Sequence, residues 1–433
     1  MSKLKDKLNH LEKDKVKKRW ETIDSHGKLS TRDKLEKLVN LSLKRDKIQK
    51  TKEKKEKSVL KEMPADEEDK NKGLIIREFS YPLNSVFGKF KLAEWQTVSP
   101  EQLALIFPDE DCEDASPMKL LFFDTETTGL SGGTGTIPFM LGFGFFADGF
   151  FRVKIFILND LYKEDAFLDE VDHFLESQPF SATVTYNGKS FDFPLMETRY
   201  ILQRKRFPLL KRPHLDFLFP ARVIWKNTYD SRKLGYLGDI LLGLSRDDDV
   251  DASQIPMMYF NYLRSSAFPL IQKVVDHNAL DLVGLAALLL LAVKYQENIA
   301  FTDDEGEILG TAKLFEKCGD FEKANQLYDI LRQSAARQDI ITQAVKSLAV
   351  LKKKKKLYKE AAELWQMVSD SSDHRVVREL SVYFEHREKN YVKALEYAQK
   401  ALATIELTNA QRKDFEKRLD RVSKKMKALE KEE

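Results

Sequence analysis

The stretch that decides the fold runs from Leu121 to Leu130 and reads LFFDTETTGL. Its apolar start predicts a buried β-strand, and two carboxylates, Asp124 and Glu126, stand at the end of that strand. Residues i and i+2 of a strand point to the same face, so these carboxylates repel each other and are costly to bury unpaired. Because carboxylate oxygens suit Mg²⁺ or Mn²⁺, we expect a divalent-cation site at this strand end.

Two further segments carry residues that such a site needs. At 186–194 the sequence reads YNGKSFDFP, in which a turn follows a β-type run and Asp192 stands at the expected start of a helix. At 276–281 it reads DHNALD inside a long helical pattern. His277 and Asp281 stand at i and i+4 there, so they share one face of that helix.

Each of these residues also has an ordinary structural use. An Asp at a turn most often caps a helix N-terminus, which is the alternative role for Asp192. A lone histidine such as His277 is usually an ordinary helical residue, and Asp281 alone is compatible with a solvated helix face. Asp276 ranks below Asp281 because its side chain points about 100° around the helix from His277. The three segments together, in this order, favour the metal site.

The segment DTETTGL after an apolar strand resembles the first motif of the DEDD 3′–5′ exonucleases, which have a ribonuclease-H-like fold. The segment YNGKSFDFP looks like the second exonuclease motif of the proofreading domains in family-B DNA polymerases. The third segment departs from the family, because it places a His at the spacing that relatives use for Tyr. With its C-terminal extension the chain looks most like the YprB-type proteins, and the motif-bearing match covers residues 118–298.

The resemblance implies a 3′–5′ exonuclease that hydrolyses phosphodiester bonds of nucleic acid with two bound ions, Mg²⁺ or Mn²⁺. It implies Asp124 as the bridging metal ligand, with Glu126 and Asp281 completing the tighter site. Asp192 would hold the second ion, and His277 would orient or deprotonate the attacking water.

For the substrate, the resemblance implies that Thr127 and Leu130 meet the terminal nucleotide, with Leu130 as an apolar wedge. Tyr186 and Phe191 are candidates to stack on bases, although Phe191 is equally compatible with a core position. Asn187 is a candidate hydrogen-bond partner near the site. A single-stranded end is the expected substrate, and DNA and RNA both remain open.

The region 118–298 alternates strand and helix patterns. Strands are expected at 119–124, 138–147, 150–157, 182–186 and around His214–Phe217, and helices at 164–177, 192–204 and 267–298. This order predicts an α/β fold, a ribonuclease-H-like mixed sheet with flanking helices. Asp216 ends the last of these strands and is a candidate to support the site.

Length and composition indicate the number of domains and the cellular compartment of the protein. A chain of 433 residues predicts two or three domains. Cys112 and Cys318 lie far apart without metal-ligand spacing, which disfavours disulfides and zinc and favours a reducing compartment. The N-terminus has no apolar signal core, and the apolar run 285–293 is too short for a membrane span of ~20 residues. We therefore expect a cytoplasmic protein without a membrane partner.

The N-terminal region 1–72 is an arm rich in lysine. Its residues 1–57 carry 20 Lys and Arg against 10 Asp and Glu, and residues 50–72 have almost no core-forming side chains. We expect this arm to be partly disordered. It serves either as a tail that attracts nucleic acid or as a solvated spacer. The next segment, 73–117, alternates apolar and polar residues and is expected to form a strand pair or an extended lead-in to the main domain.

The region 308–405 contains a repeat. Phe321, Tyr358 and Tyr391 are each followed three residues later by Ala, at spacings of 37 and 33 residues. These spacings lie near the ~34-residue tetratricopeptide period, so tetratricopeptide-like helical repeats are expected, with an ordinary helical bundle as the alternative. Residues 406–433 are expected to form a charged capping helix. A protein partner is expected to bind these repeats.

Three functions are compatible with these patterns. The first is the metal-dependent exonuclease, which the complete set of carboxylates favours. The alternative is a non-catalytic nucleic-acid-binding scaffold that keeps the exonuclease fold, which the unusual histidine spacing leaves open. A metal-dependent enzyme for another phosphoester is the third, and the polymerase-like second motif disfavours it.

Overall fold

The protein is described from a computed structural model. This structure describes residues 61–62, 67–69, 71–129, 135–244, 250–298, 302–370 and 373–429. Most of the basic arm and the expected wedge residue Leu130 lie outside these residues.

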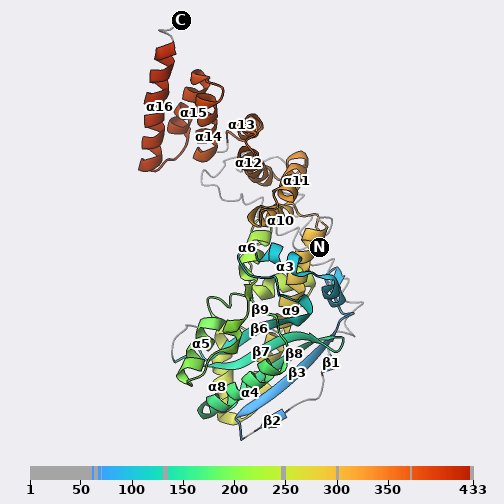
Figure 1. Cartoon of the computed structure of the whole chain (residues 1–433). Helices are drawn as coiled ribbons and strands as arrows, with labels where there is room; N and C mark the ends of the chain where they lie inside the picture. The colour runs from blue at the N-terminus through green and yellow to red at the C-terminus, as the bar shows by residue number, and fades with distance from the viewer. Residues whose placement is uncertain are drawn as a thin grey trace, which may run out of the picture. The chain divides into compact units, whose positions relative to one another are not determined.

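A mixed β-sheet forms the centre of the N-terminal part of the described chain (Figure 1). Four strands are antiparallel neighbours: β3 (Leu74–Pro82), β8 (Phe150–Leu158), β7 (Pro138–Ala147) and β6 (Leu120–Thr127). Beyond β6 the sheet continues in parallel with β9 (Ala182–Thr185) and β10 (His214–Asp216). Short strands β1 (Lys61–Glu62) and β2 (Glu67–Asp69) pair with β3 at the other edge.

Helices cover both faces of the sheet. On one face, α4 (Glu164–Ser177) and α5 (Asp192–Leu202) bury an aromatic core that includes Phe123, Phe143 and Phe174. On the other face, α9 (Pro269–Glu297) packs along β6, β7 and β8. The alternation of side chains along β6 explains this division, since Phe122 and Phe123 point to opposite faces.

Shorter elements complete this part of the chain. The described residues between β10 and α9 include the helices α6 (Leu218–Trp225), α7 (Leu234–Leu237) and α8 (Ile255–Ser265), with a π-helical turn at Gly238–Leu242 and a 3₁₀ turn at Ala252–Gln254. The segment after β3 contributes the hairpin β4 (Val86–Phe87) and β5 (Phe90–Lys91), a 3₁₀ turn at Leu92–Thr97 and α3 (Pro100–Ile106). Trp95 of this segment is fully buried against Phe122, so the segment belongs to the core that α9 covers.

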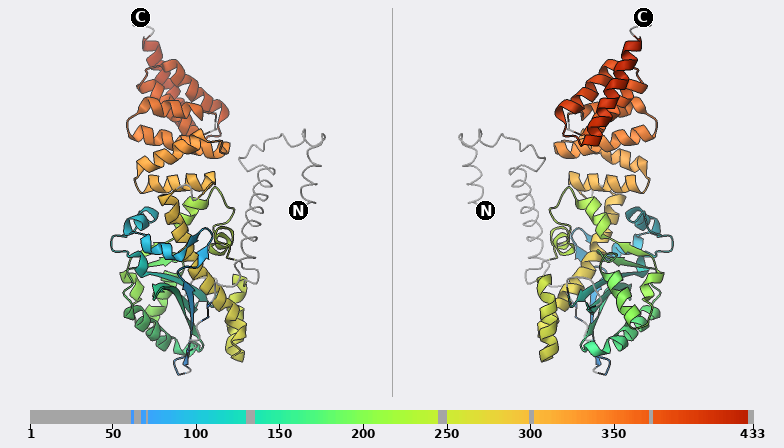
Figure 2. Two further views of the ribbon diagram at one scale, coloured as in Figure 1. Left: turned by 90° about the vertical axis from the view of Figure 1, so that its right-hand side faces the viewer. Right: turned by 90° about the vertical axis from the view of Figure 1, so that its left-hand side faces the viewer.

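The C-terminal region is helical, and Figure 2 shows its helices stacked in successive layers. The helices are α10 (Glu305–Lys317), α11 (Phe321–Gln333), α12 (Gln338–Lys354), α13 (Tyr358–Met367), α14 (His374–His386), α15 (Tyr391–Thr404) and α16 (Asn409–Leu429). Each aromatic of the sequence repeat begins the second helix of a pair, and Ala324, Ala361 and Ala394 are fully buried. Small side chains at these positions let the paired helices approach closely.

The first of these helices packs directly on the sheet-containing part. A Cβ added at Gly310 of α10 would lie 2.2 Å from the backbone oxygen of Ile224 in α6. The carboxylate of Glu307 is buried beside it and accepts hydrogen bonds from the hydroxyls of Tyr229, Tyr295 and Thr302. The contact of α6 with α10 therefore depends on backbone proximity and on a satisfied buried carboxylate.

The expected α/β fold with a helical C-terminal region is confirmed. Every strand and helix expected within 118–298 is present, with ends within about three residues of the expected ones. Asp148 and Gly149 form the expected tight turn with positive φ angles of 49° and 79°. The sequence pattern did not show that β3 joins the main sheet, nor that α6, α7 and α8 lie between β10 and α9.

Helix α9 is the one helix of the described residues that is long and apolar enough to cross a membrane by length and composition. In this structure 78% of its most apolar 18-residue window is buried. Since α9 packs along three strands of the sheet, it serves here as a core helix.

Candidate active site

The first two carboxylates lie where β6 ends. Asp124 and Glu126 alternate with Thr125, so they point to the face of the sheet that α9 covers. The pairing of β6 with β7 is regular up to Glu126 and shifts between Glu126 and Thr127. Such an irregularity bends a strand and redirects its side chains, and it lies next to the carboxylates.

Helix α9 brings the third motif over these carboxylates. The Nε2 atom of His277 lies 3.3 Å from Oδ2 of Asp281 and 3.9 Å from Oε1 of Glu126. The side chains of all three residues are 13–14% exposed, so they are accessible but largely enclosed. Asp276 is exposed on another side of α9, where it accepts a hydrogen bond from Gln272.

A residue that the sequence analysis passed over makes the most direct contact with Asp124. The amide Nδ2 of Asn278 donates a hydrogen bond of 2.7 Å to Oδ2 of Asp124. Asn278 is fully buried, and it stands at i−3 from Asp281 on the same face of α9. The spacing of three residues between Asn278 and Asp281 is the sequence signal that indicates Asn278 as a residue of the site.

The fourth carboxylate comes from the start of α5. Asp192 is the first residue of this helix, while Phe191 holds the N-cap position and makes no side-chain cap. Oδ1 of Asp192 accepts a hydrogen bond of 2.5 Å from the hydroxyl of Thr125 on β6. The side chain of Asp192 is therefore turned toward the end of β6, and the sequence analysis did not foresee the role of Thr125.

Asp216 fixes the loop that precedes Asp192. It is buried at the end of β10 and accepts backbone hydrogen bonds from Asn187 at 2.8 Å, Lys189 at 3.1 Å and Leu218 at 3.0 Å. Asn187 has a positive φ angle of 73°, which Asn tolerates better than most residues. Asp216 therefore holds the turn that positions α5.

His214 forms a second support below this loop. Its ring stacks on Phe193 with centroids 3.6 Å apart, and Nε2 lies 2.7 Å from the hydroxyl of Thr185. Burial lowers the pKa of His214 to about 3. The imidazole is therefore neutral at physiological pH and joins α5 to the strands β9 and β10.

Burial and repulsion affect the charged state of these carboxylates. Burial raises the pKa of Asp124 well above its ordinary value, and repulsion from Asp192, Asp281 and Glu126 raises it further. Burial also raises the pKa of Asp192 to about 6, although the hydrogen bond from Thr125 opposes this rise. Without a cation, the folded protein resists holding all four groups in their charged form.

The donor set fits a hard divalent cation. Asp124, Glu126, Asp192 and Asp281 offer only carboxylate oxygens, the ligands that Mg²⁺ and Mn²⁺ prefer. Within the described ranges no three His, Cys, Asp or Glu side chains are already close enough to form a coordination shell. The amide of Asn278 engages one oxygen of Asp124, which leaves the other oxygen of Asp124 for a cation. Asp192 is held by the hydroxyl of Thr125 and by backbone hydrogen bonds.

The candidate substrate residues lie in different surroundings. Thr127 donates a hydrogen bond of 2.7 Å to the backbone oxygen of Gly129, which shapes the loop after β6. The hydroxyl of Tyr186 donates to the backbone oxygen of Arg232, so its ring is held in place. Phe191 is 48% exposed, and the core alternative for this residue is wrong.

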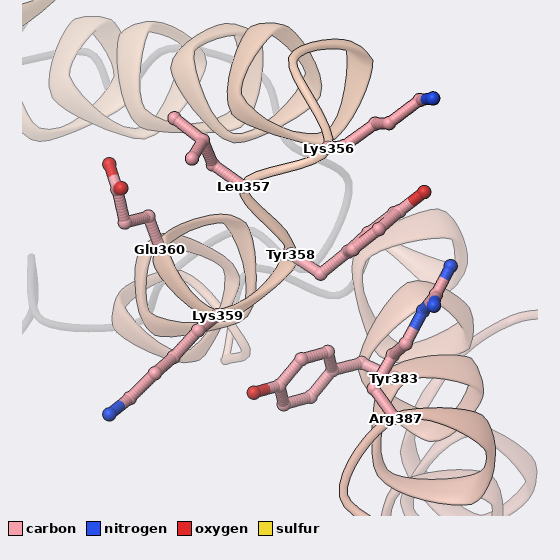
Figure 3. A pocket seen from close by; sticks show the side chains of 7 residues that line it. All are labelled: Lys356, Leu357, Tyr358, Lys359, Glu360, Tyr383 and Arg387. Atoms are coloured by element: carbon pink, nitrogen blue, oxygen red, sulfur yellow. The ribbon is translucent and has the colours of Figure 1, made fainter.

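A separate hollow of about 440 Å³ lies in the helical region, at the turn before α13 and the end of α14 (Figure 3). The guanidinium of Arg387 lies over the ring of Tyr358 at 3.9 Å. In Figure 3 the side chain of Lys356 extends on the same side as Tyr358 and Arg387, whereas the side chain of Lys359 extends away from them. The carboxylate of Glu360, which also lines the hollow, pairs with Lys352 at 2.7 Å.

Comparison with known proteins agrees with this arrangement. A model of the RNase_H superfamily matches residues 121–293, which run from the start of the first motif to the last turns of α9. The chain is also similar to the uncharacterized protein YprB of Bacillus subtilis (strain 168). The two are 33% identical over 342 residues, which cover 76% of this chain and 80% of YprB.

This chain belongs to the family of YprB, and its residues 121–293 form a domain of the RNase H superfamily. Membership indicates a nuclease that acts on nucleic acid, and nucleases of this superfamily usually use divalent metal ions. The matched residues 121–293 contain all four carboxylates of the cluster together with His277 and Asn278.

Proposed function

We propose that this protein is a 3′–5′ exonuclease that hydrolyses nucleic acid with two divalent cations, Mg²⁺ or Mn²⁺. One observation carries the proposal: on α9, the imidazole of His277 lies 3.3 Å from Asp281 and 3.9 Å from Glu126. Asn278 of the same helix donates a hydrogen bond to Asp124 at the end of β6. Four carboxylates are not gathered for stability alone, because their mutual repulsion opposes folding. A cation-dependent reaction explains their convergence.

Each residue of the cluster has its own proposed role in this reaction. Bound cations would activate a water molecule and neutralise charge on the scissile phosphate. Asp124 would bridge the ions, Glu126 and Asp281 would complete the tighter site, and Asp192 would hold the second ion. His277 lies beside Asp281 and Glu126, at the place where it would accept the proton of the attacking water.

A single-stranded 3′ end fits the surroundings of the cluster. The exposed ring of Phe191 directly precedes Asp192, so it is the aromatic side chain best placed to stack on a base. Thr127 and the loop after it would meet the terminal nucleotide.

We also propose that the protein is cytoplasmic, because its two widely separated cysteines favour a reducing compartment.

Strand polarity provides the test of the exonuclease proposal. Full-length protein is incubated with Mn²⁺ and a single-stranded oligonucleotide labelled at its 5′ end, in DNA and RNA forms. The expected result is a ladder of shortening products, which a 3′-terminal phosphate or a hairpin at the 3′ end slows. Internal cleavage that ignores the state of the 3′ end would contradict the exonuclease assignment while leaving a nuclease.

We also propose that the helices α10–α15 form tetratricopeptide-like repeats that bind an acidic segment of a protein partner. The support is the hollow around Tyr358, where Lys356 and Arg387 present positive charge beside an aromatic ring. The one carboxylate in its lining is held by Lys352, so it does not neutralise these charges.

A labelled poly-glutamate peptide with a terminal tyrosine serves as the probe for this hollow. We expect Arg387→Glu to abolish its binding and Lys424→Glu to leave binding largely intact, because Lys424 lies on α16 and does not line the hollow. Equal losses in the two variants would indicate non-specific charge attraction and would contradict the docking site.

A further inference from the structure

Asn278 is an unusual residue to find in the interior of α9. Its side chain is fully buried, and Nδ2 donates a 2.7 Å hydrogen bond to Asp124, which is 154 residues away in the chain. Its other amide atom, Oδ1, is buried and has no hydrogen-bond partner among the described residues. A buried polar atom without a partner destabilises the folded state, so packing alone does not explain an asparagine here.

The backbone of β7 is shaped to receive this amide. Gly142 is the register partner of Asp124 on the neighbouring strand. A Cβ at Gly142 would lie 1.9 Å from Oδ1 of Asn278 and 2.8 Å from Cδ1 of Leu282. The glycine therefore lets α9 come close enough for Asn278 to reach Asp124. The hydrogen bond from Asn278 to Asp124 therefore joins α9 to β6 at the carboxylate.

We propose that Asn278 is a positioning residue that holds the carboxylate of Asp124 in the orientation that binds the catalytic cations. One oxygen of Asp124 is engaged by the amide, and the other is left for the metal site. This inference rests on the proposed metal-dependent activity and adds a residue to it. Residues that orient metal ligands in this way typically contribute 10–100-fold to metal affinity or activity.

Replacement by leucine separates this role from a structural one. Leucine has nearly the same shape as asparagine but cannot donate to Asp124, and it removes the unpartnered Oδ1. Asn278→Leu removes the donor to Asp124 as well as the unpartnered Oδ1, so its two effects on the melting temperature oppose each other, while Mn²⁺ binding is expected to weaken roughly 10–100-fold. A merely structural asparagine would leave the Mn²⁺ affinity of the folded protein unchanged.

The experiment measures Mn²⁺ binding to full-length wild type, Asn278→Leu and Asn278→Ala by calorimetry, with thermal melts of the same samples in EDTA. Leu290→Ala is the control, because Leu290 is fully buried on α9 and lies nine residues, about two and a half turns, beyond Asp281. It is expected to lower the melting temperature and to leave Mn²⁺ affinity unchanged. Single-turnover cleavage rates should fall with Mn²⁺ affinity in the Asn278 variants, while oligonucleotide binding stays constant.

The outcomes separate the two proposals. If wild type binds Mn²⁺ and cleaves nucleic acid but both Asn278 variants bind Mn²⁺ equally well, the positioning role is wrong and the exonuclease proposal survives. If wild type itself neither binds Mn²⁺ nor cleaves, the exonuclease proposal fails and the positioning role fails with it. A loss of Mn²⁺ affinity in folded Asn278→Leu protein supports the inference.

Discussion

His277 and Asp281 lie one turn apart on α9, with Nε2 of the imidazole 3.3 Å from Oδ2 of the carboxylate. The same imidazole reaches to within 3.9 Å of Glu126 on β6. The histidine four residues before Asp281 is therefore turned into the carboxylate cluster. This geometry allows His277 to act as the base that its position in the third motif suggests.

We expect His277→Ala to lower the cleavage rate at saturating substrate by ~10²–10⁴, the usual contribution of a general base. His277→Tyr should keep part of the activity, because tyrosine at this spacing can orient a water through its hydroxyl. Asp276→Ala is the control, since Asp276 is exposed and faces away from the cluster. Wild-type rates in His277→Ala between pH 6 and 9 would show that the residue only packs beside the site.

Asp124→Asn should abolish activity and stabilise the metal-free protein. Because the pKa of Asp124 is raised in the folded state, the folded protein holds this proton more tightly than the unfolded chain does. The stability that protonation supplies is fully present below about pH 4 and is lost as pH rises through the folded pKa. In EDTA, the melting temperature of Asp124→Asn should therefore exceed that of wild type at pH 7.5, and by less at pH 4.5. A variant less stable than wild type at both pH values would contradict the repulsion.

The pKa of His214, which burial lowers to about 3, gives a pH dependence of opposite sign. The unfolded chain takes up a proton near pH 6.5 and the folded protein does not, so stability falls as pH drops below 6.5. The expected slope is at most about 1.4 kcal/mol per pH unit. His214→Gln removes this slope, so the unfolding free energies of variant and wild type should converge as pH falls from 7 to 5. Parallel curves would show that His214 titrates normally in the folded state.

Glu385 anchors the last helix. Its buried carboxylate on α14 accepts hydrogen bonds from Arg418 at 3.0 Å, Arg421 at 2.7 Å and Lys425 at 2.8 Å on α16. Arg421 and Lys425 hold the pKa of Glu385 at about 2 despite its burial. The stabilisation is present above about pH 4.5 and is lost as pH falls toward 2.

Glu385→Ala leaves the buried Arg418 without its partner, so we expect a loss of roughly 3 kcal/mol, measured by urea unfolding at pH 7. The control is Asp420→Asn, which removes an exposed pair with Lys424 and should cost well under about 1 kcal/mol. Similar losses in both variants would contradict the anchoring role of Glu385.

Local sequence patterns predicted the elements of this fold well. The Asp148–Gly149 turn and the long apolar pattern of α9 are local, so neighbouring residues are enough to recognise them. The pairing of β3 with β8 was not predictable, because strand pairing between distant segments leaves no local pattern. The same holds for the contact of α6 with α10, which depends on Gly310 and a buried Glu307.

For the site, motifs identified the residues but not the contacts between them. Asn278 is part of the third motif. Its hydrogen bond to Asp124 forms only because Gly142 has no side chain where α9 packs on the sheet. Thr125 lay between the two carboxylates of the first motif, and only the fold shows that its hydroxyl reaches Asp192. For Phe191, the sequence is compatible with either base stacking or a core position, and its exposure excludes the core position.

One measurement tests the central claim most directly: degradation of a 5′-labelled single-stranded oligonucleotide by purified full-length wild type and Asp124→Asn, with Mn²⁺ and with EDTA. We predict stepwise shortening by wild type in Mn²⁺, none in EDTA, and none by Asp124→Asn, although the variant binds the oligonucleotide and melts cooperatively. Wild-type protein that binds the strand but never shortens it would favour the non-catalytic scaffold. Undiminished cleavage by Asp124→Asn would contradict the carboxylate cluster as the catalytic centre.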